Sequence, residues 1–259
     1  MIEIKGLSFS YGRDEFIKDL DLTLPDSALV AVVGENGSGK TTLLSLISGE
    51  LRAKAGEIKI DGHIQKTTKR SELSKMLSVF VQSRETTDMT GAELVTMGRY
   101  PYIKNKFITP SNDVEAARSA LIRVGAEAFA DRRLNSLSYG ERQRIYLAMQ
   151  IAQGAQNMLL DEPTNYLDVS ARFQTMELLR SLKNEGKCVA CVLHDVSLAL
   201  TYADLIAVMK GGRLIAFDTP ESIYRDKKLD EAFGVKFCRT EHEGRVIYSA
   251  IPNSILKYN

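Results

Sequence analysis

The chain contains no tryptophan, only three cysteines and no long apolar run. Its longest apolar runs, such as residues 28–33, are far shorter than the roughly 20 residues that a membrane-spanning helix needs. The first five residues, Met-Ile-Glu-Ile-Lys, lack the apolar core of a signal peptide. These absences predict a protein that stays in the cytoplasm, although it can dock on a protein embedded in a membrane.

The chain also lacks an excess of charge of either sign. The chain has 34 basic and 33 acidic residues, which leaves a net charge of +1. This balance creates no general field that would favour nucleic acid or an anionic membrane, so we expect no nucleic-acid partner. The sequence has no internal repeat, low-complexity tract or heptad segment. Its 259 residues suffice for one large or two small domains.

Cys188 and Cys191 form a C-x-x-C pair, a spacing that metal and redox sites use. The surrounding residues 188–193 are apolar and rich in valine, which is typical of a buried strand. Residues three apart on a strand point to opposite faces. The sequence therefore favours buried packing for both thiols.

Short apolar or alternating segments predict the strands. The expected strands cover residues 2–9, 20–24, 29–33, 56–62, 77–82, 157–160 and 189–193. Two hairpins are expected around glycine, 205–209 with 213–217 and 235–238 with 245–249. Helical patterns cover residues 41–51 and 113–124, the second with start signals at Pro110 and Ser111. We interpret residues 84–153 as a helical subdomain inserted into an α/β core.

Residues 34–41 read Gly-Glu-Asn-Gly-Ser-Gly-Lys-Thr and match the phosphate-binding pattern G-x-x-x-x-G-K-[ST]. Glycines allow backbone N–H groups to surround phosphate, and a helix N-terminus favours the negative charge. Lys40 is expected at the β- and γ-phosphates, and the Thr41 hydroxyl at Mg²⁺. The alternative is a glycine-rich turn that binds nothing, but the predicted strand, loop and helix stand in the order that the motif requires.

Asp161 and Glu162 follow a predicted buried strand. At the carboxyl edge of a parallel sheet they would face the ligand of the phosphate loop. Asp161 suits the outer shell of Mg²⁺, and Glu162 suits a general base that polarises the attacking water. The alternative is a pair of exposed carboxylates in a turn before Pro163.

Three further residues are candidates because of their place beside predicted strands. Gln82 ends one strand and is expected to contact Mg²⁺ or the water. His194 follows another and is expected to hydrogen-bond the γ-phosphate. Tyr11 follows the first strand and is expected to stack on adenine. Taken alone, each residue favours a structural or surface role, so the functional roles depend on the other motifs.

Residues 137–143 read Leu-Ser-Tyr-Gly-Glu-Arg-Gln, in which Ser138 and Glu141 have the spacing of a helix capping box. A helix start with an accessible hydroxyl and with Gly140 in its first turn is also an anion site. A second phosphate-binding element is explained if the protein forms a homodimer, in which Ser138 reads the phosphate held by the other chain. The alternative is a plain capped helix.

In this order, the motifs resemble the ATP-binding subunit of ABC transporters over nearly the whole chain. The resemblance implies a P-loop NTPase (RecA-like) α/β core with an N-terminal antiparallel β-subdomain and an inserted helical subdomain. The core would comprise residues 1–83 and 154–259, and the helical signature subdomain residues 84–153. It also implies that Asp168 belongs to a loop that crosses the dimer. The predicted nucleotide-binding residues are Tyr11, Gly34, Asn36, Gly37, Ser38, Gly39, Lys40, Thr41, Thr42, Ser138, Gly140, Glu141 and Asp168.

The catalytic residues implied are Glu162, His194, Lys40 and Gln82, and the Mg²⁺ residues Thr41, Gln82 and Asp161. Residues 95–101 resemble the sequence pattern found in importers of iron–siderophore, haem and cobalamin complexes. The alternative is that Arg99 and Tyr100 simply cap and pack a helix. The family usually has two adjacent glycines in its signature, and here the first is Tyr139. Our hypothesis is that Tyr139 is tolerated and both sites hydrolyse ATP.

The resemblance predicts a peripheral protein on the inner face of the cell membrane that hydrolyses ATP to ADP and phosphate. Its expected partners are a second copy, separate permease subunits and, indirectly, an extracytoplasmic substrate-binding protein. The favoured cargo is a ferric siderophore. Alternatives are a haem, cobalamin or efflux system, a soluble ABC ATPase acting outside transport, or a nucleotide-gated module with little turnover.

Overall fold

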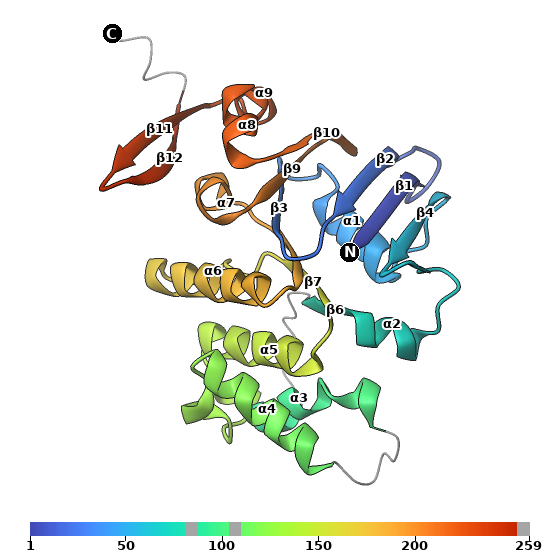
Figure 1. The fold of residues 1–259 in the computed structure, drawn as a ribbon, viewed down its shortest axis with the longest axis vertical. Helices are drawn as coiled ribbons and strands as arrows, with labels where there is room; N and C mark the ends of the chain where they lie inside the picture. The colour runs from blue at the N-terminus through green and yellow to red at the C-terminus, as the bar shows by residue number, and fades with distance from the viewer. Residues whose placement is uncertain (81–87, 104–109, 253–259) are drawn as a thin grey trace. The chain divides into compact units, whose positions relative to one another are not determined.

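The computed structural model describes residues 1–80, 88–103 and 110–252 of the chain (Figure 1). The chain divides into two compact units. The first unit comprises Met1–Lys66 and Leu179–Asn259, and the second comprises Thr67–Leu178. Each unit is described by itself below.

The first unit begins with an antiparallel sheet in the order β2-β1-β4-β5. Its strands are β1 (Ile2–Phe9), β2 (Ile17–Leu24), β4 (Ala55–Ile60) and β5 (His63–Ile64). Alternate side chains of β2 are buried, as the period of a strand requires when one face packs on a core. Ile2 and Ile4 of β1 are likewise almost fully buried. The early alternating pattern of the sequence therefore forms the expected strands.

The first unit also contributes four strands, in the order β10-β9-β3-β8, to a second sheet. These strands are β3 (Leu29–Gly34), β8 (Cys188–Val192), β9 (Leu205–Lys210) and β10 (Arg213–Asp218). β3 runs parallel to both β8 and β9, and every residue of β3 and β8 is buried. Such continuous apolar strands are typical of parallel sheets covered on both faces. The antiparallel pair β9–β10 confirms the first predicted hairpin.

The helices of the first unit are α1 (Lys40–Ser48), α7 (Val196–Tyr202), α8 (Pro220–Arg225) and α9 (Lys228–Phe233). α1 ends at Ser48, three residues before the predicted end, because Gly49 takes a left-handed conformation that caps the helix. β11 (Lys236–His242) and β12 (Arg245–Ile251) pair antiparallel and confirm the second predicted hairpin.

The second unit joins two parallel strands to a group of helices. Its elements are α2 (Arg70–Met76), β6 (Leu77–Phe80), α3 (Gly91–Met97), η1 (Tyr100–Tyr102), α4 (Ser111–Arg123), η2 (Glu127–Phe129), η3 (Leu134–Ser136), α5 (Tyr139–Gln153) and β7 (Asn157–Asp161), followed by the start of α6 (Val169–Asn184). α3, α4 and α5 pack on one another (Figure 1). The predicted limits of the helical subdomain, residues 84 and 153, stay a prediction.

Both thiols of the C-x-x-C pair are fully buried in β8. Burial raises the pKa of Cys188 and of Cys191 to about 12. The buried-packing interpretation of this pair is therefore confirmed. None of the helices in the described ranges is long and apolar enough to span a bilayer.

Candidate phosphate and metal site

The phosphate loop connects the end of β3 to the start of α1. Gly37 and Gly39 have φ values of 78° and 104°, which favour glycine, and α1 begins at Lys40. A Cβ atom added at Gly39 would lie 2.7 Å from Ile17 Cδ1. The N–H of Gly212, in the turn between β9 and β10, donates to the Ser38 carbonyl at 3.1 Å. Neighbouring segments of the same unit therefore hold the loop in shape.

Lys40 is 6% exposed although its side chain is charged. Its Nζ donates to the carbonyl oxygens of Gly34 at 2.8 Å and of Glu35 at 3.0 Å. A buried ammonium group needs such partners, because desolvation is costly. The loop thus holds a positive charge at the helix start, where the backbone N–H groups also favour an anion.

Two other predicted residues lie in the same unit as this loop. The Tyr11 hydroxyl is 3.0 Å from Thr42 Oγ1 of α1, and the tyrosine ring is 66% exposed. His194 is exposed just beyond β8. The N–H of Leu193 donates to the carbonyl of Val32 at 3.1 Å, so β8 and β3 end at the same edge of the sheet.

Asp161 and Glu162 lie in the second unit, at the end of β7, and both are partly exposed. Glu162 has φ 53°, an uncommon value for a non-glycine residue. The N–H of Asn165 donates to the Glu162 carbonyl at 3.2 Å, and Asn165 Nδ2 donates to Glu162 Oε2. The carboxylate therefore sits in a closed turn rather than on a free loop.

Ser138 caps α5 in the same unit. Its N–H donates to Glu141 Oε2 at 2.8 Å and its Oγ accepts from the Glu141 N–H at 3.4 Å, which confirms the capping box. The bond from the Ser138 N–H lowers the pKa of the Glu141 carboxyl group. Asp168 plays a similar part for α6, because its Oδ1 accepts from the Ala171 N–H at 2.8 Å.

The predicted site residues are thus divided between the units. The first unit holds Tyr11, Gly34, Asn36, Gly37, Ser38, Gly39, Lys40, Thr41, Thr42 and His194. The second holds Ser138, Gly140, Glu141, Asp161, Glu162 and Asp168. Gln82 lies outside the described residues.

The ABC transporter family model matches residues 17–165. The chain belongs to the ABC transporter family. The ferric enterobactin transport ATP-binding protein FepC of Escherichia coli is 34% identical to it, over 89% of this chain and 86% of FepC. The hemin import ATP-binding protein HmuV of Pseudomonas fluorescens is also 34% identical, over 95% of this chain and 97% of HmuV. A dimeric ATP-binding cassette solved in a post-hydrolysis state with ADP and phosphate matches at a TM-score of 0.76 and 25% identity, over 85% of this chain and 99% of that one.

These matches confirm the predicted fold, a P-loop NTPase with an antiparallel β-subdomain. This ABC-family chain is an ATPase whose hydrolysis of ATP is coupled to transport. The individual roles expected for the site residues stay predictions.

The motifs in the sequence predicted no role for Gln143 or Asn165. Gln143 Nε2 donates to the Pro163 carbonyl, directly beside Glu162. Asparagine is common in turns, so Asn165, shortly after Pro163, did carry a signal for a turn in the sequence. Nothing in the sequence pairs Gln143 with Pro163, because 20 residues separate them.

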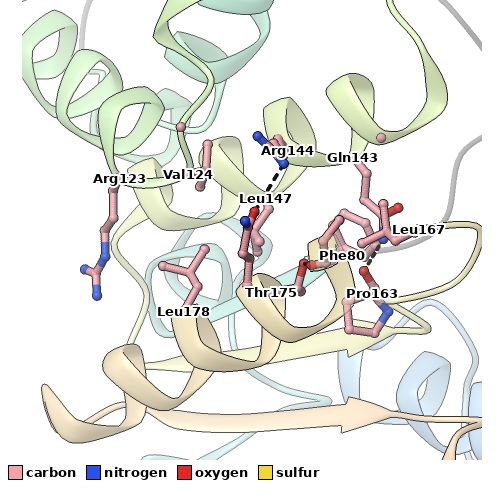
Figure 2. A pocket seen from close by; sticks show the side chains of 14 residues that line it. Phe80, Arg123, Val124, Gln143, Arg144, Leu147, Pro163, Leu167, Thr175 and Leu178 are labelled. Carbon is pink, nitrogen blue, oxygen red and sulfur yellow. Dashed lines mark hydrogen bonds between the residues drawn. The ribbon is translucent and has the colours of Figure 1, made fainter. Parts of the chain in front are cut away.

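The second unit of this ABC protein also contains a pocket of about 280 Å³, shown in Figure 2. Gly140, Gln143 and Leu147 of α5 line one side of it, and Pro163, Leu167 and Thr175 line another. Gln143 is 6% exposed, and its Oε1 has no hydrogen-bond partner within the described ranges. The pocket therefore borders the contact between Gln143 and the loop of Glu162.

Proposed function

We propose that this chain is the ATP-hydrolysing subunit of an importer for an iron complex, working beneath separate permease subunits. The observation that carries the proposal is the phosphate loop, in which Lys40 is held by the carbonyls of Gly34 and Glu35 at the start of α1. A buried cation beside helix N–H groups fits the β- and γ-phosphates of ATP.

The donors fit Mg²⁺ by their chemistry. The Thr41 hydroxyl is exposed in the first turn of α1, and Asp161 offers a partly exposed carboxylate at the end of β7. Hard oxygen donors of this kind are the ligands that Mg²⁺ prefers. Thr41 and Asp161, with Gln82, would hold the ion, which would neutralise charge on the phosphates.

Hydrolysis needs a group that orients water on the γ-phosphate. We assign this role to the carboxylate of Glu162. We also assign to His194 a hydrogen bond with the γ-phosphate. The exposed ring of Tyr11 offers a stacking face for adenine. The glycine N–H groups of the loop, with Ser38 and Thr42, would surround the phosphates.

A second copy of the chain would complete each site. Ser138 is exposed at the start of α5, with Gly140 in the first turn, and the helix start is an anion site. The similar ABC cassette with bound ADP and phosphate is a dimer. In the proposed dimer, Ser138, Gly140 and Glu141 of one chain face the ATP bound by the other, and Asp168 lies in the loop between the sites.

The proposed cargo comes from the relatives. FepC is named for ferric enterobactin and HmuV for hemin, and both names denote iron complexes. We favour a ferric siderophore, delivered by an extracytoplasmic binding protein to permease subunits whose inner face carries this chain. Haem import, cobalamin import and efflux stay alternatives.

The test is reconstitution with the permease that co-purifies with the chain from membranes. Liposomes containing this complex are offered a ferric siderophore, hemin or cobalamin with its binding protein. ATP-dependent uptake of the ferric siderophore supports the proposal, and loss of uptake with Glu162→Gln ties it to hydrolysis. Uptake of hemin or cobalamin alone would reject the siderophore assignment. Absence of a co-purifying permease would reject the proposed separate permease subunits.

A further inference from the structure

The first turns of α5 touch the loop that follows Glu162. Tyr139 and Gln143 are four residues apart and therefore lie on one face of the helix. Figure 2 shows the Gln143 amide donating to the Pro163 carbonyl. The ring of Tyr139 meets that of Tyr166 edge to face, with centroids 5.3 Å apart. One helix face thus contacts both ends of a short loop.

The same loop orients Glu162. Asn165 donates from its backbone N–H to the Glu162 carbonyl and from Nδ2 to the Glu162 carboxylate. Pro163, between them, is buried and accepts the bond from Gln143. A shift of Gln143 would therefore act on the turn that fixes the direction of this carboxylate.

Packing beside Gln143 is open, because the pocket of about 280 Å³ borders this side chain. Elsewhere in a protein, dense packing holds a side chain in place. Beside this pocket, the hydrogen bond to Pro163 holds the Gln143 side chain in place where packing is incomplete. Removing the amide would also leave the Pro163 carbonyl without this partner, which is costly for a buried group.

We propose that α5 positions Glu162 within its own chain, with Gln143 and Asn165 as positioning residues. The inference rests on the proposed function, in which Glu162 polarises the attacking water. When the start of α5 meets the nucleotide held by a second copy, the contact passes through Gln143 and Pro163 to the Glu162 that serves the other nucleotide.

The contact between Tyr139 and Tyr166 also links the start of α5 to the loop that follows Glu162. Tyr139, the unusual residue of the signature, packs against this loop of its own chain. Tyr166 in the loop is 69% exposed and has φ 58°. A Cβ added at Gly140 would lie 3.5 Å from Leu167 Cδ2, so this next residue also follows the loop closely. A glycine in place of Tyr139 would have no ring to contact Tyr166.

The test compares steady-state ATP hydrolysis by the full chain and three variants. Gln143→Leu and Asn165→Leu remove one donor each, and we expect kcat to fall about 10- to 100-fold because a misplaced group loses its alignment. The KM for ATP should stay within about twofold, since the phosphate loop is untouched. Asn165→Ser keeps a donor and should recover most of kcat.

Gln174→Leu is the matched control. Gln174 Oε1 accepts from Arg144 Nη2 at 3.3 Å, a bond that joins α5 to α6 beside the same pocket but does not involve the Glu162 loop. Its kcat should equal that of the wild type. If Gln143→Leu does not fold, Asn165→Leu decides, because Asn165 is only half-buried.

Each result has a separate meaning. Wild-type protein without hydrolysis would overturn the proposed function and this inference together. Normal hydrolysis with leucine variants equal to wild type would overturn this inference alone. A rise in KM that accounts for the whole loss, or failure of Asn165→Ser to recover kcat, would assign both residues to folding or binding and also reject it.

Discussion

At the scale of single residues, we predict that Lys40 is the charge on which nucleotide binding depends most. In that role, replacing it with alanine would remove charge-assisted hydrogen bonds to phosphate, each contributing about 1.5–3 kcal/mol. We expect Lys40→Ala to weaken ATP binding by at least about 10-fold in calorimetric titration. Lys59→Ala is the control, since Lys59 forms an exposed pair with Glu57 in the same unit. Equal affinities of the two variants would contradict the assigned role of Lys40.

The cysteines offer a second test at this scale. Cys188 and Cys191 have pKa values raised to about 12 by burial, so both thiols remain protonated well above pH 8 and are shielded from reagents. Cys238 is partly exposed. A thiol reagent at pH 8 should therefore label one cysteine in the native protein and all three in urea. Rapid native labelling of Cys188 or Cys191 would show that β8 is not buried as described.

At the scale of elements, Arg99 joins three helical segments of the second unit. It follows α3, its Nε donates to Asp113 of α4 at 2.8 Å, and its Nη1 donates to the Ala152 carbonyl near the end of α5 at 2.8 Å. The side chains of Arg99 and Asp113 are 19% and 8% exposed. Arg99 therefore does cap and pack helices, which is the structural alternative that the sequence left open for it. This role does not depend on whether residues 95–101 also help to choose a partner.

Removing Arg99 should leave the carboxylate of Asp113 buried without its cation. Breaking a buried pair in this way costs about 3–5 kcal/mol, so Arg99→Met should lower the free energy of unfolding by about 3 kcal/mol in urea titrations. Arg118→Met is the control, because the pair of Arg118 with Glu127 is exposed and should contribute less than about 1 kcal/mol. Equal midpoints for both variants would show that Arg99 does not hold these helices.

Local elements were predictable where a short pattern determines them. The glycines and Lys40 of the phosphate loop, the Ser138–Glu141 capping box and both glycine hairpins are all such patterns, and the structure contains each of them. The contact of Gln143 with Pro163 was not predictable, because it depends on how α5 packs on a loop 20 residues away. The predicted end of α1 was wrong because the apolar pattern continues past Gly49, where a left-handed backbone ends the helix.

At the scale of the whole molecule, the sequence order of the motifs predicted the family, but no motif in one chain shows how two copies meet. The exposed start of α5, at Ser138, is the feature of the chain that a partner would complete. Tyr166 and Val169, 69% and 68% exposed, lie just beyond the Glu162 turn. Exposed apolar side chains beside a candidate site are typical of an interface.

A variant that binds ATP without hydrolysing it should therefore accumulate as a dimer. Glu162→Gln removes the carboxylate but keeps the size and a polar tip, so ATP should remain bound between two chains. Light scattering with saturating ATP and Mg²⁺ should give twice the 28.8 kDa of one chain. Lys40→Ala in the same background should need a higher ATP concentration to form the dimer, because it binds the nucleotide more weakly. A monomer of Glu162→Gln under saturating ATP would reject the dimeric site, and with it the role of Ser138 in contacting the partner's ATP.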